Sequence, residues 1–187
     1  EIGTALFFVA SYALWPIDID TTTALITFIS WLVAGVGLTI LFAYDAKWFL
    51  LPDAVNYTVA GVALVGVIAA AVGSADPALV LLNAAGGVAV LSGIYLVIYL
   101  VSRGRWIGFG DVKLGVGLGL LVADWQLALV ALFLANLVGC LFVMPLMAIG
   151  KVKRTSYVPF GPLLIIGMIL AQFFGAQLLA LLAFPIY

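Results

Sequence analysis

The sequence predicts an all-α, polytopic membrane protein, a helical bundle of about six to seven transmembrane helices. Three observations support this fold class. First, 67% of the 187 residues are hydrophobic and only 8% are charged, whereas soluble domains average about 45–50% apolar and about 25% charged residues. Second, the mean hydropathy is +1.36. Third, most apolar runs approach the roughly 20 residues that a membrane-spanning helix needs. We expect residues 1–187 to form a single membrane-embedded domain.

The apolar runs are separated by short polar breaks rich in glycine, proline and charged residues, which are typical of loops. The first run is short, and we expect it to be the truncated remnant of a first span. The fifth run is also short. The expected spans are Ile2–Trp15, Thr22–Tyr44, Ala54–Val72, Ala78–Val101, Asp111–Val122, Gln126–Ile149 and Phe160–Ala183.

The charged residues predict how the spans are oriented. If the spans alternate in direction, the loops after the second, fourth and sixth spans share one side. These loops and their edges hold every basic residue of the chain: Lys47, Arg103, Arg105, Lys113, Lys151, Lys153 and Arg154. The charged residues of the opposite loops are all acidic: Asp18, Asp20, Asp76 and Asp124. Because cytoplasmic loops are enriched in Lys and Arg, we expect a multi-pass protein of the inner (plasma) membrane whose basic side faces the cytoplasm.

Composition also limits the kinds of site and partner. The chain has no His and a single Cys, Cys140, so an internal disulfide is excluded and no metal site is expected, because structural zinc needs several such ligands. We expect no cofactor and no nucleic-acid partner, and the lipid bilayer is the expected surrounding. The net charge of −1 indicates no further partner, and a homodimer is compatible with the sequence.

Two aspartates end apolar runs on the predicted cytoplasmic side. Asp45 closes the second span and Asp111 opens the fifth, so both lie at the same membrane boundary. An ionisable residue there is costly and indicates function. The alternative to a functional role is that each of these aspartates is only the solvent-exposed end of a helix. Asp111 and Asp53 both lie at the start of a predicted helix, where a negative charge is stabilising, and Asp53 resembles an N-cap. Asp45 stands near a helix C-terminus, where a negative charge is disfavoured.

A pair of carboxylates can hydrolyse a peptide bond with a water molecule held between them. The ionised member accepts a proton from the water, and the protonated member polarises the scissile carbonyl. Two carboxylates that share a site cannot easily both ionise, so the pair keeps one proton. Gly108 and Gly110 have no side chain, so a substrate strand can approach Asp111 closely. Lys113 is expected to orient or neutralise this loop.

Three motifs resemble those of the prepilin and preflagellin peptidases, the GxGD class of membrane aspartic proteases. The motifs are Asp45-Ala46-Lys47-Trp48-Phe49-Leu50-Leu51-Pro52-Asp53, in which an Asp is followed by Leu-Pro-Asp; Gly108-Phe109-Gly110-Asp111-Val112-Lys113-Leu114, in which GxGD is followed by Lys and Leu; and Val158-Pro159-Phe160-Gly161-Pro162, which is similar to the Pro-Phe-Gly-Pro that opens the last span of the family. The resemblance extends from about Trp31 to the C-terminal end.

The resemblance implies that Asp45 and Asp111 form the catalytic pair and that Asp53 is a supporting acid. It also implies type IV pilin-like precursors as substrates, cut where a basic leader peptide meets an apolar helix at the cytoplasmic side. We expect Asp53 to pair with a Lys or Arg of the leader. Many bacterial members carry two CxxC pairs that are linked to N-methylation. Because this sequence contains neither pair, it does not predict a methyltransferase.

Two other classes of protein are compatible with the sequence. An ion- or proton-coupled transporter would use intramembrane Asp residues to bind cations or relay protons, but it favours carboxylates near the midplane and repeated halves. A non-catalytic scaffold for pilus or secretion machinery predicts that Asp111 can be replaced by Asn without loss.

Two loops are predicted to control substrate access, and one helix face is predicted to pack tightly. The loops Arg103–Phe109 and Lys151–Tyr157 flank the motifs and are candidates for substrate gating. Gly115 and Gly119 are four residues apart and therefore share one face of a helix, where small residues allow a second helix to approach closely. We expect this face to provide ordinary tight packing.

Overall fold

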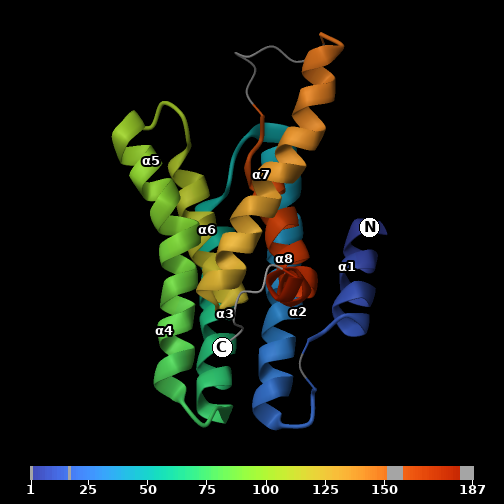
Figure 1. The fold of residues 1–187 in the computed structure, drawn as a ribbon, viewed down its shortest axis with the longest axis vertical. Coiled ribbons are helices and arrows are strands. Elements are labelled where there is room, and N and C mark those ends of the chain that lie inside the picture. The colour runs from blue at the N-terminus through green and yellow to red at the C-terminus, as the bar shows by residue number, and fades with distance from the viewer. Residues whose placement is uncertain (1, 17, 151–157, 182–187) are drawn as a thin grey trace.

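The computed structural model describes residues 2–16, 18–150 and 158–181, and every regular element in these ranges is helical (Figure 1). The elements are α1 (Ile2–Ala13), α2 (Thr22–Trp48), α3 (Asp53–Gly73), α4 (Pro77–Val88), the π-helix η1 (Ala89–Gly93), α5 (Ile94–Ser102), α6 (Phe109–Val122), α7 (Trp125–Ala148) and α8 (Gly161–Leu181). The predicted all-α, polytopic bundle is confirmed.

Five of the described helices are long and apolar enough to cross a membrane. They are Thr22–Trp48, Asp53–Gly73, Pro77–Ser102, Trp125–Ala148 and Gly161–Leu181, the third of which joins α4, η1 and α5 into one continuous helix. The two short runs form α1, with 12 residues, and α6, with 14 residues. Both are shorter than the roughly 20 residues of a full span, so the described bundle has five long spans and two short helices, and the short helices are the two runs that the sequence predicted to be short.

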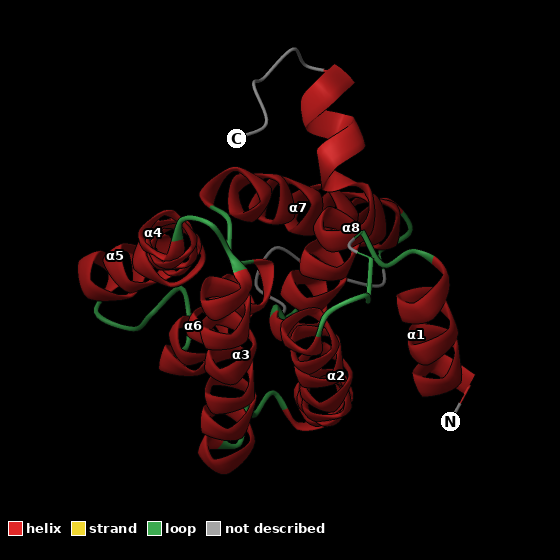
Figure 2. Cartoon of the chain, turned by 90° about the horizontal axis from the view of Figure 1, so that it is seen from below, coloured by secondary structure: helices red, strands yellow, loops and turns green. Residues whose placement is uncertain are grey.

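Helix α6 contacts most of the other helices of the bundle. The pairs α2–α3 and α7–α8 make the most extensive contacts, and α6 packs against α3, α4, η1, α5, α7 and α8. Figure 2 shows α2, α3 and α6 on one side of the bundle and α7 and α8 on the other. The residues that α6 buries include Val112, Leu114, Leu118 and Val122, so apolar burial and close packing fix the helix that carries Asp111.

Glycines allow α6 to lie directly on the span formed by α4, η1 and α5. A Cβ atom on Gly119 would stand 2.6 Å from the backbone of Val88, and one on Gly115 would stand 2.8 Å from the carbonyl carbon of Leu91. Such distances are shorter than real Cβ contacts, so only glycine fits at these positions. The predicted small-residue face of α6 is therefore confirmed as a tight helix-packing face.

The turn between α6 and α7 lies about midway along the long span that begins at Pro77. A Cβ atom on Gly87, the eleventh of that span's 26 residues, would be 3.5 Å from the backbone of Asp124. The expectation that Asp124 marks the far side of the membrane is wrong, because the 14 residues of α6 rise only about 21 Å. Instead, Asp124 caps α7 by accepting a hydrogen bond from the Leu127 N–H at 2.8 Å.

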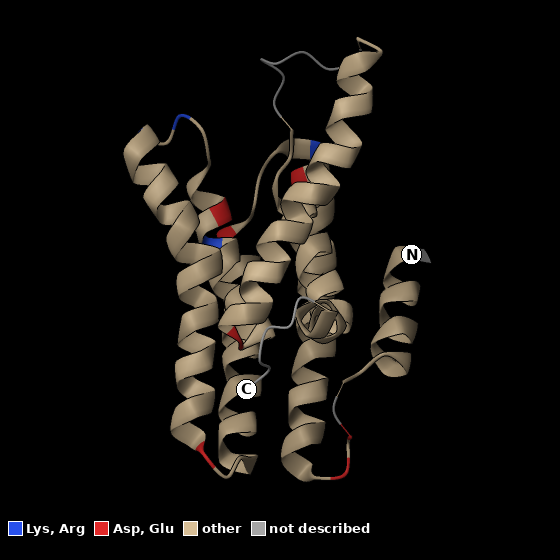
Figure 3. Cartoon of the chain, viewed as in Figure 1, with Lys and Arg blue, Asp and Glu red and all other residues tan. Residues whose placement is uncertain are grey.

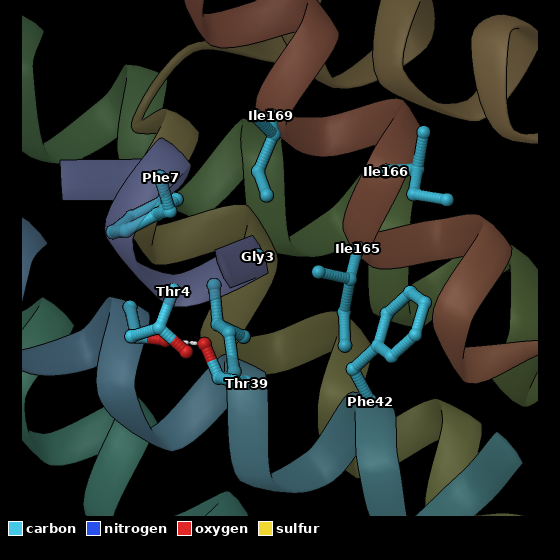
Figure 4. A pocket seen from close by; sticks show the side chains of 10 residues that line it. Gly3, Thr4, Phe7, Thr39, Phe42, Ile165, Ile166 and Ile169 are labelled. Atoms are coloured by element: carbon cyan, nitrogen blue, oxygen red, sulfur yellow. Dashed lines mark hydrogen bonds between the residues drawn. The ribbon is translucent and has the colours of Figure 1, made fainter. Parts of the chain in front are cut away.

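Helix α1 is held against α2 by aromatic side chains. The Phe7 ring stacks on Trp31 with 5.5 Å between centroids, and the buried Trp31 Nε1–H donates to Ser11 Oγ at 2.9 Å. A cavity of about 270 Å³ lies where α1, α2 and α8 meet (Figure 4). Its lining is mostly apolar, with Phe42 and Ile165 among the residues that point into it.

The charged residues are unevenly distributed along the bundle. Figure 3 shows the described Lys and Arg residues toward the end where α5 connects to α6, whereas acidic residues occur at both ends and between them. The residues 151–157, which contain the other predicted basic cluster, lie outside the described ranges. The end that carries the described basic residues also carries the site described next.

Candidate active site

Asp45 lies in the last turn of α2 and is only 6% exposed. The helix continues to Trp48, four residues past the predicted end at Tyr44, because the polar residues of this turn do not interrupt its hydrogen bonding. The Phe49 N–H still donates to the Asp45 carbonyl at 2.9 Å, but the left-handed backbone of Phe49 (φ 53°) turns the following chain away and ends the helix. Asp45 is therefore held by regular helix on one side and by a helix stop on the other.

The Asp45 carboxylate faces the first residue of α8. The Gly161 N–H donates a buried hydrogen bond to Asp45 Oδ2 at 2.9 Å. The first N–H groups of a helix have no partner within the helix, and the positive end of the helix dipole lies there. A Cβ atom at Gly161 would stand 2.8 Å from the same oxygen. Gly161 thus brings a donor to Asp45 at a distance that no side chain at this position would allow.

Asp111 lies in the first turn of α6 and is half-buried. Gly108 is the N-cap, and its carbonyl accepts a hydrogen bond from the Asp111 N–H at 3.2 Å. Neither Gly108 nor Gly110 has a positive φ, so neither glycine is required here for a left-handed conformation. A Cβ atom on Gly110 would stand 3.2 Å from the Leu51 side chain. Gly110 therefore provides close packing on Leu51, whereas Gly108 borders the cavity.

The structure brings Asp45 and Asp111 together at one cavity of about 730 Å³. Their charges lie close enough to interact, although 66 residues separate them in the sequence. The remaining wall comes from α5, the segment before α6, α7 and the segment before α8, including Tyr95, Trp106, Ile107, Gly108, Asn136 and Phe160. Among the described residues, no carboxylate lines the cavity of Figure 4.

Asp53 and Lys113 form an ion pair beside this cavity but do not line it. Lys113 Nζ lies 2.7 Å from both carboxylate oxygens of Asp53. It also lies 5.6 Å from the Tyr57 ring centroid and 5.2 Å from that of Phe109. The interpretation of Asp53 as an N-cap is wrong, because Pro52 occupies that position and Asp53 is the first residue of α3. The pair connects the start of α3 to the turn of α6 that holds Asp111.

Other predicted features are placed as follows. In the segment between α5 and α6, residues 104–108 line the cavity, so this predicted gating loop borders the site. The other predicted gating loop, residues 151–157, lies outside the described ranges. Among the described residues, no group of three or more His, Cys, Asp or Glu residues is placed to hold a metal ion. Cys140 is exposed on α7.

The fold and the cavity define a class: a polytopic helical membrane protein with two aspartates at one cavity near an end of the bundle. Residues 32–144 match the sequence model of the type IV leader peptidase family. The chain belongs to this family.

The chain is also similar to individual members of curated function. It is 26% identical to a prepilin leader peptidase/N-methyltransferase of Pseudomonas aeruginosa, over 95% of this chain and 58% of the relative. It is 32% identical to a protein of the same name from Aeromonas salmonicida, over 50% of this chain and 32% of that relative. The chain therefore spans little more than half the length of the first relative. No solved structure matches it.

Proposed function

We propose that this protein is a membrane aspartic endopeptidase that removes the basic leader peptide from type IV prepilin-like precursors. The family and the names of the relatives support this class of activity. The observation that carries the proposal is that Asp45 and Asp111, from two helices far apart in the sequence, line one cavity and interact through their charges. This arrangement meets the need of carboxylate catalysis for two acids that share a site.

In the proposed reaction, one carboxylate is ionised and the other is protonated. Backbone N–H groups favour the charged form of both carboxylates, from Gly161 at Asp45 and from Gly108 at Asp111. We take Asp45 as the ionised member, and exchanging the two roles leads to the same products. A water molecule adds to the scissile carbonyl carbon and gives one proton to Asp45, while Asp111 gives its proton to the carbonyl oxygen. The C–N bond then breaks: the nitrogen takes the proton from Asp45, Asp111 takes a proton back from one of the two hydroxyl groups on the carbon, and a carboxyl group and an amine are released.

The proposed substrate follows from the place of the cavity. The cavity lies toward the end of the bundle that carries the described Lys and Arg residues (Figure 3), which the positive-inside rule assigns to the cytoplasm. A precursor whose leader stays in the cytoplasm and whose following helix lies in the membrane would present its junction at this depth. We infer that this junction enters between the segment before α6 and the segment before α8, which both line the cavity.

The dyad is tested by cleavage of a precursor with a basic leader, a Gly and an apolar helix, in detergent or lipid. Asp45→Asn and Asp111→Asn keep size and polarity but remove the carboxylate, so each is expected to abolish detectable cleavage while the protein remains folded. Asp18→Asn is the matched control, because Asp18 is an exposed acid outside the cavity, and it is expected to cut at the wild-type rate.

Three outcomes decide the proposal. Loss of cleavage in both dyad variants, with normal folding and an active control, supports it. Near wild-type cleavage by either dyad variant rejects the dyad. A wild-type protein that cuts no pilin-like precursor would favour the scaffold or transporter classes instead.

A further inference from the structure

Tyr95 has a buried hydroxyl at the cavity that contains the two aspartates. The residue is 3% exposed and lines the same cavity as Asp45 and Asp111. Its hydroxyl has no hydrogen-bond partner among the described residues, although it lies close enough to Asp111 for an electrostatic interaction. An unpaired buried hydroxyl lowers the stability of a fold, so each such group calls for an explanation, and a catalytic role is one of them. At this cavity, a partner that arrives with the substrate would satisfy the hydroxyl.

The surroundings of Tyr95 hold its ring in place. The ring packs edge-on against Phe160, with 5.4 Å between centroids and an interplanar angle of 66°. Tyr95 is the second residue after the π-helix η1, and π-helical turns occur frequently at functional sites. In η1, Ser92 Oγ donates a buried hydrogen bond to the Val112 carbonyl at 2.9 Å. The segment that carries Tyr95 is thus bonded to the residue next to Asp111.

We propose that Tyr95 is a third catalytic residue, whose hydroxyl donates a hydrogen bond to the oxygen of the scissile carbonyl. This inference rests on the proposed peptidase function. When water adds to the carbonyl carbon, the C=O electron pair moves to the oxygen, which receives the proton of the protonated carboxyl group. The phenol O–H stabilises the charge that develops on that oxygen, and it neither gains nor loses a proton. A preorganised donor of this kind acts on the transition state more than on the bound substrate.

The first experiment compares Tyr95→Phe with Tyr99→Phe in steady-state cleavage of the same precursor. Tyr95→Phe removes only the hydroxyl and keeps the ring against Phe160. We expect kcat to fall about 10- to 100-fold with KM changed less than about twofold, since loss of an oxyanion donor reduces kcat about 10²–10³-fold and a phenol is one donor among several. Tyr99 is the matched control, one helical turn further on, with its ring against Phe109 and outside the cavity lining.

The second experiment measures thermal unfolding of the same variants. Because the Tyr95 hydroxyl is buried and unpaired, its removal is expected to leave Tm unchanged or to raise it. A merely structural hydroxyl would instead lower Tm and activity together.

Each combined result has a clear meaning. A lower kcat with undiminished Tm supports the role of Tyr95. Wild-type kcat in Tyr95→Phe, or a loss of kcat that accompanies a loss of Tm, overturns it while the peptidase function stands. If the wild type and Tyr99→Phe both fail to cut, the proposed function fails and the inference fails with it.

Discussion

At the scale of single residues, Gly161 supports the proposed chemistry without contributing a side chain. Its N–H holds Asp45, and a Cβ atom would stand 2.8 Å from the carboxylate oxygen and 3.4 Å from Leu51. We therefore predict that Gly161→Ala displaces Asp45 and lowers the cleavage rate at least about tenfold, since a misplacement of about 1 Å can cost a factor of about 100. The measurement is kcat on the precursor described above.

The control for Gly161→Ala is the same substitution at Gly61, an exposed position of α3 with nothing within 4 Å of a Cβ atom. Gly61→Ala is expected to keep the wild-type kcat. Wild-type kcat in Gly161→Ala would show that Asp45 does not depend on this contact.

A second prediction concerns Asp53, for which two roles can be separated. If Asp53 pairs with a basic leader, Asp53→Asn should slow cleavage of basic leaders only. If it mainly holds Lys113, as the 2.7 Å ion pair suggests, Asp53→Asn and Lys113→Met should slow cleavage of basic and neutral leaders alike, several-fold each. The double variant should then be no slower than either single one, because both changes break the same pair.

We expect the second pattern, since Lys113 already occupies both oxygens of Asp53. The measurement is kcat/KM for paired precursors that differ only in leader charge. Selective loss on basic leaders would restore the leader-binding role of Asp53.

The sequence predicted the two aspartates but not their partners. Asp45 and Asp111 stand out because a carboxylate at the edge of an apolar run is visible from neighbouring residues alone. Tyr95 lies in an apolar run in which both the buried and the lipid-facing positions are apolar or aromatic. The sequence therefore does not show which aromatic side chains face the cavity. Gly161 is 116 residues from Asp45, so only the folded chain could show its hydrogen bond, although the third motif marked its position.

At the scale of the helices, the contact of α6 with the span formed by α4, η1 and α5 is sensitive to added volume. We predict that Gly119→Ala lowers the free energy of unfolding by about 2–3 kcal/mol, because overpacking costs about 1–3 kcal/mol and the Cβ atom would meet the backbone of Val88 at 2.6 Å. Thermal unfolding in detergent should show a Tm lower by several degrees.

Gly61→Ala serves here as well, because alanine in an open helical position is more favourable than glycine by about 1 kcal/mol. Its Tm should be unchanged or slightly higher. Equal Tm values for Gly119→Ala and the wild type would mean that α6 can move away from α4 at little cost.

The boundaries of the helices were predictable where hydropathy alone decides them. The expected span Ala54–Val72 differs from the observed Asp53–Gly73 by one residue at each end. The depth of the turn at Asp124 was not predictable, because the sequence shows that the fifth run is short but not which helix lies beneath its end. The π-helix was not predictable either, because its residues, Ala89–Gly93, follow the same apolar pattern as an ordinary α-helix.

At the scale of the whole molecule, the distribution of charge predicts the orientation in the membrane. The loop that carries Arg105 should face the cytoplasm, and the turn between α3 and α4 should face the opposite side. We predict that an impermeant thiol reagent modifies Ala75→Cys from outside intact spheroplasts, and Arg105→Cys only in inverted vesicles. Both variants need a Cys140→Ala background, because the native Cys140 is exposed.

Labelling of the two positions from the same side would contradict alternating spans, and labelling with the sides exchanged would place the dyad away from the cytoplasm. Either result would remove the argument that a cytoplasmic leader reaches the cavity. The single cysteine of the chain makes this measurement direct, since its removal leaves only the introduced thiol.

The π-helix at Ala89–Gly93 has a consequence for how this wall of the cavity tolerates insertions and deletions. A π turn holds one residue more per hydrogen-bonded ring than an α-helix, and one residue of α-helix corresponds to a rotation of about 100°. Deletion of a single residue from this segment would let the span become a continuous α-helix of nearly the same length. α5 would then keep the same face toward the cavity, because the π turn only accommodates the extra residue. If the segment became α-helical with no residue deleted, α5 would instead turn about its axis by roughly that angle, and Tyr95 would leave the cavity although no side chain of α5 had been altered.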